Sequence, residues 1–196
     1  KGMVMARDNP HRPFTPPPEL VAVTPDVSGN EINGLGEVEP RAARMVYWAP
    51  DPDDIPHGKM QRWFYSRDPD DPHIAKARAD RIERLAAEVP EISGPPRQQS
   101  PEEWASALQA FADDGPMEMV GVTSMKPDYL LEGARVPETR IIMVGVAHDY
   151  EEISTAPKTR AGAEVLRQYG RAGAAAKLVT GWLHQQGWAA RPVTGP

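Results

Sequence analysis

The fold is decided by residues 140–196, which read RIIMVGVAHDYEEISTAPKTRAGAEVLRQYGRAGAAAKLVTGWLHQQGWAARPVTGP. An apolar run opens this stretch, an acidic loop follows, and a long alanine-rich helical pattern then ends at a glycine. A second short apolar run comes after the glycine. This order predicts a strand, a loop, a long helix and a returning strand, which together are typical of an α/β layered domain.

Two strands are predicted at the start of this domain, which we place at residues 100–196. Met119–Thr123 has the composition of a strand, and residues 126–131 are expected to form a short helical turn after it. Arg140–Ala147 is the second strand. Its apolar residues are almost continuous, which predicts burial on both faces of a helix-covered sheet.

The long helix is expected to run from Pro157 to Gln186, with Thr155 as its N-cap and Gly187 after its C-terminus. Four glycines weaken the pattern: Gly162, Gly170, Gly173 and Gly181. They predict either a break near Tyr169-Gly170 or a close contact with another backbone or a large flat ligand. Trp188–Val193 is expected to be the returning strand.

Two further helices are predicted upstream. Pro72–Val89 is amphipathic, with Asp71 as its N-cap, and a linker follows it within the segment 71–99. The second helix begins after Ser100, and the capping box that Ser100 forms with Glu103 supports its start. Its predicted core face consists of Trp104, Leu108 and Phe111.

Residues 1–70 are expected to form an extended, proline-rich arm that wraps the surface or a partner. Two acidic pieces, 51–57 and 68–73, predict solvated turns, with a site for a hard cation as the alternative. Between them, Met60–Tyr65 is an aromatic cluster that either anchors the arm or stacks on a flat ligand.

The composition excludes several classes of function. The net charge is −6 and no dense Lys/Arg patch is present, which argues against nucleic acid as the main partner. The sequence has no apolar run long enough to span a membrane and no signal-peptide core, so we expect a cytoplasmic protein. The chain has no cysteine, which excludes disulfides, a thiol nucleophile and a cysteine-ligated cluster within it.

A ligand is most reasonably sought at His148-Asp149-Tyr150, where the second strand ends. These residues either face a ligand or satisfy the strand end and cap the following helix. The sequence contains no phosphate-binding loop at the junction between this strand and the long helix. A Ser/His/Asp set does not follow from the sequence either, so we assign no catalytic residue and no metal ligand.

An ordered series of steps begins with the apolar strand MVGVT at 119–123. The steps that follow are Asp149-Tyr150-Glu151, Thr155-Ala156-Pro157, Tyr169-Gly170-Arg171 and Gln186-Gly187-Trp188-Ala189-Ala190. Over roughly residues 100–196, this series resembles the N-terminal half of corrinoid- and iron–sulfur-dependent reductive dehalogenases.

The resemblance implies a flavin-reductase-like scaffold that holds a cobalamin, here present in part. It places Asp149, Tyr150 and Thr155 on the cofactor side. The 4Fe-4S clusters and the catalytic residues would lie in a remainder of the same protein or in a cysteine-bearing partner subunit, and the substrate would be a small organohalide. We also expect both ends of the chain to be incomplete, since it begins at Lys1 and stops at Pro196 directly after the predicted strand.

Two alternatives to a dehalogenase-like enzyme stay open. The first is a non-catalytic module that binds a corrinoid or docks to a partner. The second is a relative of the epoxyqueuosine reductases, which share the implied fold but place an acidic residue directly after the Tyr-Gly-Arg step. This chain has Ala172 at that position, and its acidic net charge also disfavours a tRNA substrate.

Overall fold

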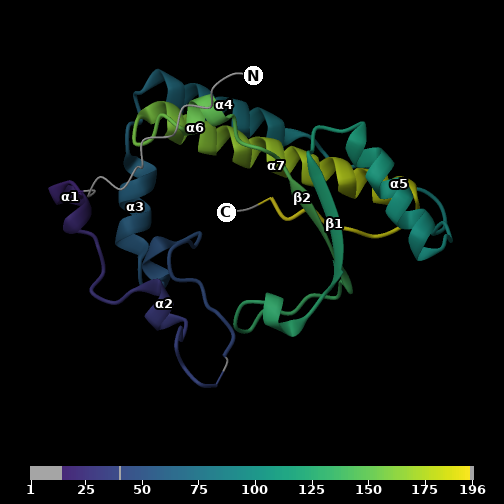
Figure 1. The fold of residues 1–196 in the computed structure, drawn as a ribbon, viewed down its shortest axis with the longest axis horizontal. Coiled ribbons are helices and arrows are strands. Elements are labelled where there is room, and N and C mark those ends of the chain that lie inside the picture. The colour runs from purple at the N-terminus through teal and green to yellow at the C-terminus, as the bar shows by residue number, and fades with distance from the viewer. Residues whose placement is uncertain (1–14, 40, 195–196) are drawn as a thin grey trace, which may run out of the picture. The chain divides into compact units, whose positions relative to one another are not determined.

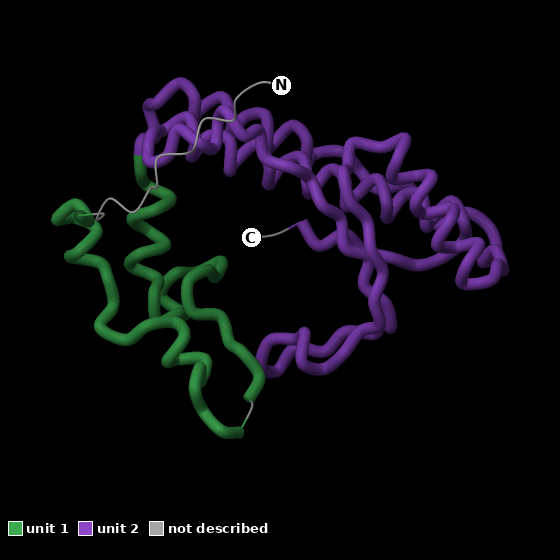
Figure 2. Tube along the Cα trace, viewed as in Figure 1, with its two compact units in different colours: residues 1–67 green, residues 68–196 purple. Residues whose placement is uncertain are grey.

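The computed structural model describes residues 15–39 and 41–194, and the chain divides into two compact units (Figure 2). Unit 1 comprises Lys1–Arg67 and unit 2 comprises Asp68–Pro196. The beginning of the predicted arm, residues 1–14, lies outside the described residues.

From residue 15 onward, the described part of unit 1 consists of short helices joined by turns rather than of a continuous extended arm. Its helical segments are α1 (Pro18–Val21), α2 (Gly29–Ile32), the 3₁₀ turn η1 (Pro52–Asp54) and α3 (Gly58–Ser66). The acidic piece at 51–57 forms a turn, because the Asp51 carboxylate accepts a hydrogen bond from the N–H of Asp53 at 2.9 Å. Gln61 of α3 binds both backbone groups of Ala49 and so fixes the segment ahead of that turn.

Unit 2 contains four helices, a 3₁₀ turn and a two-stranded sheet (Figure 1). Within the described residues its elements are α4 (Pro72–Ala86), α5 (Pro101–Asp113), β1 (Met119–Ser124), η2 (Pro127–Tyr129), β2 (Arg140–Gly145), α6 (Tyr150–Ile153) and α7 (Thr159–Gln185). The expectation of a mixed α/β structure is therefore confirmed at this coarse level.

Both upstream helices begin where the sequence predicts. The Asp71 carboxylate accepts from the N–H groups of His73 and Ile74, and Ser100 and Glu103 form the full capping box. Helix α4 ends at Ala86 rather than at Val89, because residues 87–90 leave the helix ahead of Pro90.

Helix α7 is one unbroken helix of 27 residues, so the predicted break near Tyr169-Gly170 is wrong. Its N-cap is Lys158, and the prediction of Thr155 for that role is also wrong. The hydroxyl of Thr155 instead donates to the carbonyl of Glu152 and closes the turn after α6. Gly187 has φ 79° directly after the helix, as its predicted place requires.

The glycines of α7 allow α4 to approach closely, which confirms the alternative of a backbone contact. A Cβ at Gly170 would lie 3.1 Å from the Cα of Arg81, and one at Gly173 would overlap the Leu85 side chain. Lys177 then binds the last carbonyls of α4, donating to those of Leu85 and Ala87. The two helices are therefore packed nearly backbone to backbone.

The sheet is a two-stranded antiparallel ribbon in which Val120 pairs with Val144 and Val122 with Ile142. Val120, Ile142 and Val144 pack on a core formed by α5 and α7. The other face is open, and Met143 on it is 62% exposed, so the prediction of burial on both faces is wrong. The strand is apolar on both sides, but α5 and α7 cover only one of its faces.

The returning strand predicted at Trp188–Val193 does not form. Side chains of α7 and its surroundings hold this segment instead: His184 Nε2 lies 2.9 Å from the carbonyl of Ala190, and Arg191 binds Glu138. Pro192 has no N–H to donate to a ladder, which also disfavours a strand.

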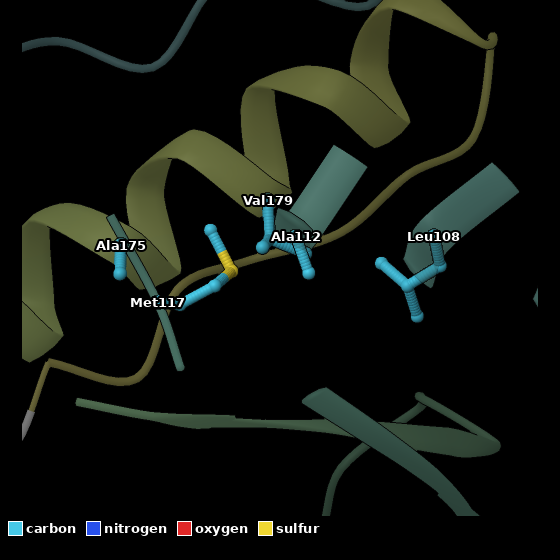
Figure 3. Close-up of a cluster of buried hydrophobic side chains, with 5 residues drawn as sticks. All are labelled: Leu108, Ala112, Met117, Ala175 and Val179. Carbon is cyan, nitrogen blue, oxygen red and sulfur yellow. The ribbon is translucent and has the colours of Figure 1, made fainter. Parts of the chain in front are cut away.

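The main core lies where the ribbon meets α5 and α7. Its buried side chains come from α5, α7 and the turn before β1: Leu108, Ala112, Met117, Ala175 and Val179 (Figure 3). Trp182 of α7 stacks on Phe111 with ring centroids 5.3 Å apart. None of the helices within residues 15–39 and 41–194 is both long enough and apolar enough to cross a bilayer.

Candidate functional site

The candidate site is the loop between β2 and α6, residues 146–149, together with the first turns of α6 and α7. Asp149 begins α6, and its carboxylate accepts a hydrogen bond from the N–H of Glu152 at 3.1 Å. The capping role considered from the sequence is thus confirmed for Asp149. A contact between this residue and a cofactor stays a prediction.

Tyr150 and Thr155 differ in how far they face solvent. Tyr150, the first residue of α6, is 54% exposed. Thr155 is partly buried, and its hydroxyl donates to the carbonyl of Glu152 at 2.8 Å. Of the three residues that the resemblance places on the cofactor side, two therefore hold the α6 turn together and one presents a phenol at the surface.

The most buried charged residue of this region is Glu164 of α7, which is 2% exposed and was not predicted from the sequence. Its Oε1 accepts from the N–H of Asp149 at 2.8 Å and from the Gln168 amide at 2.6 Å. His148 Nδ1 lies 3.7 Å from the same oxygen. A buried carboxylate needs such partners because burial removes its hydration, and here it fixes the loop onto α7.

Two arginines of α7 link this buried carboxylate to the surface. Arg167 lies 3.3 Å from Glu164 and 3.7 Å from Glu152, so it joins the two acids. Arg160 donates through Nε to Glu152 at 3.0 Å. The hydrogen bond from Arg160 holds the pKa of the Glu152 carboxyl below its usual value, and the charge of Arg167 acts in the same direction.

The Tyr169-Gly170-Arg171 step, which carries part of the resemblance, faces two neighbours. The guanidinium of Arg81 on α4 lies over the ring of Tyr169 at 5.6 Å. Arg171 points the other way and donates to the carbonyl of Ala147 at 3.3 Å in the candidate loop. This step therefore ties the end of β2 to the α4–α7 pair.

One pattern in the sequence indicates that Glu164 and Gln168 are buried. Ala161, Glu164, Gln168, Ala175 and Val179 recur at helical spacing and form the buried side of α7. Two polar residues among alanines on that side indicate a buried polar network. The carbonyl oxygen of the Gln168 side chain is buried and accepts no hydrogen bond from any described residue.

The arrangement supports positioning rather than covalent chemistry. Glu152 and Glu164 are paired with arginines, and the N–H of Asp149 holds the loop to the Glu164 carboxylate. Within the part of the chain that the structure describes, no cluster of three metal-ligating side chains occurs. A hollow of about 560 Å³ lies in unit 1 beside Trp48 and Tyr65, and one of about 420 Å³ lies in unit 2 between α5 and α7.

Neither hollow is lined by Asp149, Tyr150 or Thr155. The polar groups of Asp149 and Thr155 are already used within the α6 turn. These residues do not by themselves form a corrin site, and we derive no chemical step through a corrinoid. Comparisons with protein-family models, curated proteins and solved structures found no match to this chain.

Proposed function

We propose that this chain is the N-terminal portion of a cobalamin- and iron–sulfur-dependent oxidoreductase that resembles the reductive dehalogenases. Such an enzyme replaces the halogen of a small organohalide with hydrogen. In this portion, the β1–β2 ribbon and α7 serve as a partial flavin-reductase-like scaffold. The clusters and catalytic residues belong to the remainder of the protein or to a cysteine-bearing partner subunit, and the enzyme is cytoplasmic.

One observation carries the proposal: the resembling steps fall at the junctions of one connected structure. The first forms β1, and the Asp149-Tyr150-Glu151 step begins α6 at the end of β2. The Tyr169-Gly170-Arg171 step joins that loop to α4, and Gly187 ends α7. Residues that recur in a family for a structural reason are expected at such junctions.

The chemistry explains why a second polypeptide segment is required. Replacing a carbon–halogen bond with a carbon–hydrogen bond consumes two electrons and one proton and releases a halide ion. This chain contains no cysteine that could ligate an electron-carrying cluster. The electrons must therefore reach the substrate through groups held elsewhere, while this portion positions the loop at 146–149.

The test is to read the gene beyond Pro196 and to purify the entire encoded polypeptide without oxygen. We expect an open frame with two cysteine clusters and a coloured protein that contains cobalt and iron. A colourless full-length protein without cobalt would contradict the proposal. A stop codon after Pro196 would favour the second function, a non-catalytic module that binds a corrinoid or docks to a partner.

The absence of cysteine is the observation that favours this module. To distinguish the non-catalytic module from the enzyme, the chain is titrated with hydroxocobalamin. The corrin absorbance is recorded for wild type and for the variant Tyr150→Phe. A module gives saturable binding that Tyr150→Phe weakens, while Tyr129→Phe serves as the control. An epoxyqueuosine reductase-like enzyme is the third candidate, and the methyl side chain of Ala172 cannot supply the proton that its pattern implies.

A further inference from the structure

The outer edge of β1 carries backbone groups that have no hydrogen-bond partner among the residues that the structure describes. The N–H of Met125 donates to the carbonyl of Thr139 at 3.0 Å and continues the register of the ribbon. Hydrogen-bonded pairs alternate along an antiparallel ladder, so Val120, Val122 and Ser124 direct their N–H and C=O groups away from β2. Among the described residues, only the Thr123 hydroxyl approaches one of these groups, the carbonyl of Ser124 at 3.5 Å.

Nothing in the sequence of β1 protects this edge. The strand reads MVGVTS and contains no charged residue and no proline, which are the usual means of blocking a free edge. Val122 at its centre is 55% exposed although its side chain belongs to the helix-covered face. The edge therefore combines unpaired backbone groups with an uncovered apolar side chain.

We propose that β1 pairs antiparallel with β1 of a second copy of this chain, with Val122 on the two-fold axis. The pairing places Val122 opposite its own counterpart and Val120 opposite Ser124 of the other copy. It joins the two ribbons into one four-stranded sheet in the order β2-β1-β1-β2. The outward groups of Val120, Val122 and Ser124 are all hydrogen-bonded in that sheet.

Charge complementarity selects this register and this occupant. In a pairing centred on Val122, Glu118, which directly precedes β1, comes near Lys126, two residues after the end of β1 in the second copy, and symmetry repeats the pair. Both side chains are exposed, and the Glu118 carboxylate also accepts from the N–H of Ala147 at 2.8 Å and lies 3.6 Å from Arg171. Opposite charges brought close together across a sheet edge stabilise the pairing.

The free edge of β2 lacks this complementarity. A two-fold pairing centred on Ile142 would place Arg140 opposite Val144 of the second copy, with no carboxylate opposite the guanidinium. Arg140 is also the kind of charged residue that blocks association at an edge. The two edges of the ribbon are therefore distinguishable by experiment.

Disulfide trapping tests the pairing directly, because the chain has no cysteine of its own. Val122→Cys introduces one thiol per copy at the proposed axis, where paired Cα atoms about 5.5 Å apart suit a disulfide. We expect mild oxidation to convert most of this variant into a covalent dimer. Ile142→Cys, at the equivalent place on the other edge, is the matched control and should cross-link at least tenfold more slowly.

Sedimentation of the untagged chain supplies the second readout. We expect wild type to be a dimer that dissociates on dilution, and Val122→Thr to behave alike because it keeps the N–H group. Val122→Pro removes the outward N–H without touching the inner ladder, so it should fold with an unchanged circular dichroism spectrum yet remain monomeric. Lys126→Glu should raise the dissociation constant about tenfold.

Two outcomes would overturn the pairing. One is a wild-type chain that stays monomeric at every accessible concentration. The other is a dimer in which Val122→Cys cross-links no faster than Ile142→Cys. Should Val122→Pro fail to fold, Lys126→Glu and the two cysteine variants still decide the question.

Discussion

The helical layer and the ribbon of unit 2 differ in how completely neighbouring elements cover them. In the helical layer, α4 and α6 pack on α7 through glycine contacts, a buried carboxylate and capped helix ends. The ribbon has helices on one face only, and its other face and both edges have no covering element among the described residues. The helical layer is closely packed. The ribbon exposes apolar side chains, and its edges carry backbone groups without hydrogen-bond partners among the described residues.

This difference indicates where the chain is structural and where it interacts. A region without space tolerates little change, because any added atom displaces backbone. A ribbon with an open face and open edges is where we propose that further polypeptide adds. This reasoning underlies the proposed pairing of two β1 strands.

The largest effect is expected in the buried network. Glu164→Ala should lower the free energy of unfolding by about 3 kcal/mol, because it leaves the Asp149 N–H and the Gln168 amide without their acceptor. Chemical denaturation measures this loss. Glu151→Ala, which removes an exposed acid from α6, is the control and should change stability by less than about 0.5 kcal/mol. Equal effects of the two changes would mean that Glu164 is not buried.

Replacing one glycine with valine in each region compares how the helical layer and the ribbon tolerate the same added side chain. Gly170→Val should cost about 2 kcal/mol, since its Cβ meets the Arg81 backbone at 3.1 Å. Gly121→Val in β1 should be neutral or stabilising, because a Cβ there meets no other atom within 4 Å. Thermal unfolding of both variants gives the comparison. A tolerated Gly170→Val would contradict the close packing of α4 on α7.

The two faces of the ribbon should respond differently to the same polar change. Val144→Thr introduces a hydroxyl on the face that packs against the core and should cost about 1 kcal/mol. Met143→Thr lies on the open face and should alter stability by less than about 0.5 kcal/mol. A larger cost at Met143, measured in dilute solution, would show that the open face is covered.

The smallest effect concerns pH. The pKa of Glu152 is lower in the folded chain than in the unfolded chain because Arg160 donates to its carboxylate. The pair therefore stabilises the fold above the ordinary pKa of glutamate, about 4.3, and this contribution disappears as the pH falls through the lowered value. Glu152→Gln should flatten that part of the stability curve. If the stability of Glu152→Gln still falls as steeply at acidic pH, other carboxylates are responsible for that loss.

Local signals in the sequence predicted more of the helical layer than of the ribbon. Asp71, Ser100 and Gly187 act over one turn of chain, so their roles as caps could be read directly. The continuity of α7 could not be predicted in this way. The destabilisation caused by its glycines is offset by the close packing of α4, which is a tertiary contact. Burial of β2 and the returning strand at 188–193 also depended on partners that the local pattern does not specify.

The candidate site was located but only partly understood from the sequence. The end of β2 was predicted as the place to look, and the cap formed by Asp149 was one of two roles considered for the loop residues. Glu164 was overlooked because a glutamate in a long helix is usually solvated. Its burial follows from the loop folding back onto α7 over 15 residues of sequence.

Amide hydrogen exchange, followed residue by residue in a sample dilute enough to be monomeric, tests the contrast between the closed helical layer and the open ribbon most directly. We expect the slowest exchange at Ala175 and Val179 of α7, intermediate protection at Gly121 and Thr123, and fast exchange at Val122. A Val122 amide as slow as that of Gly121, or α7 amides as fast as those of the β1 edge, would contradict the contrast.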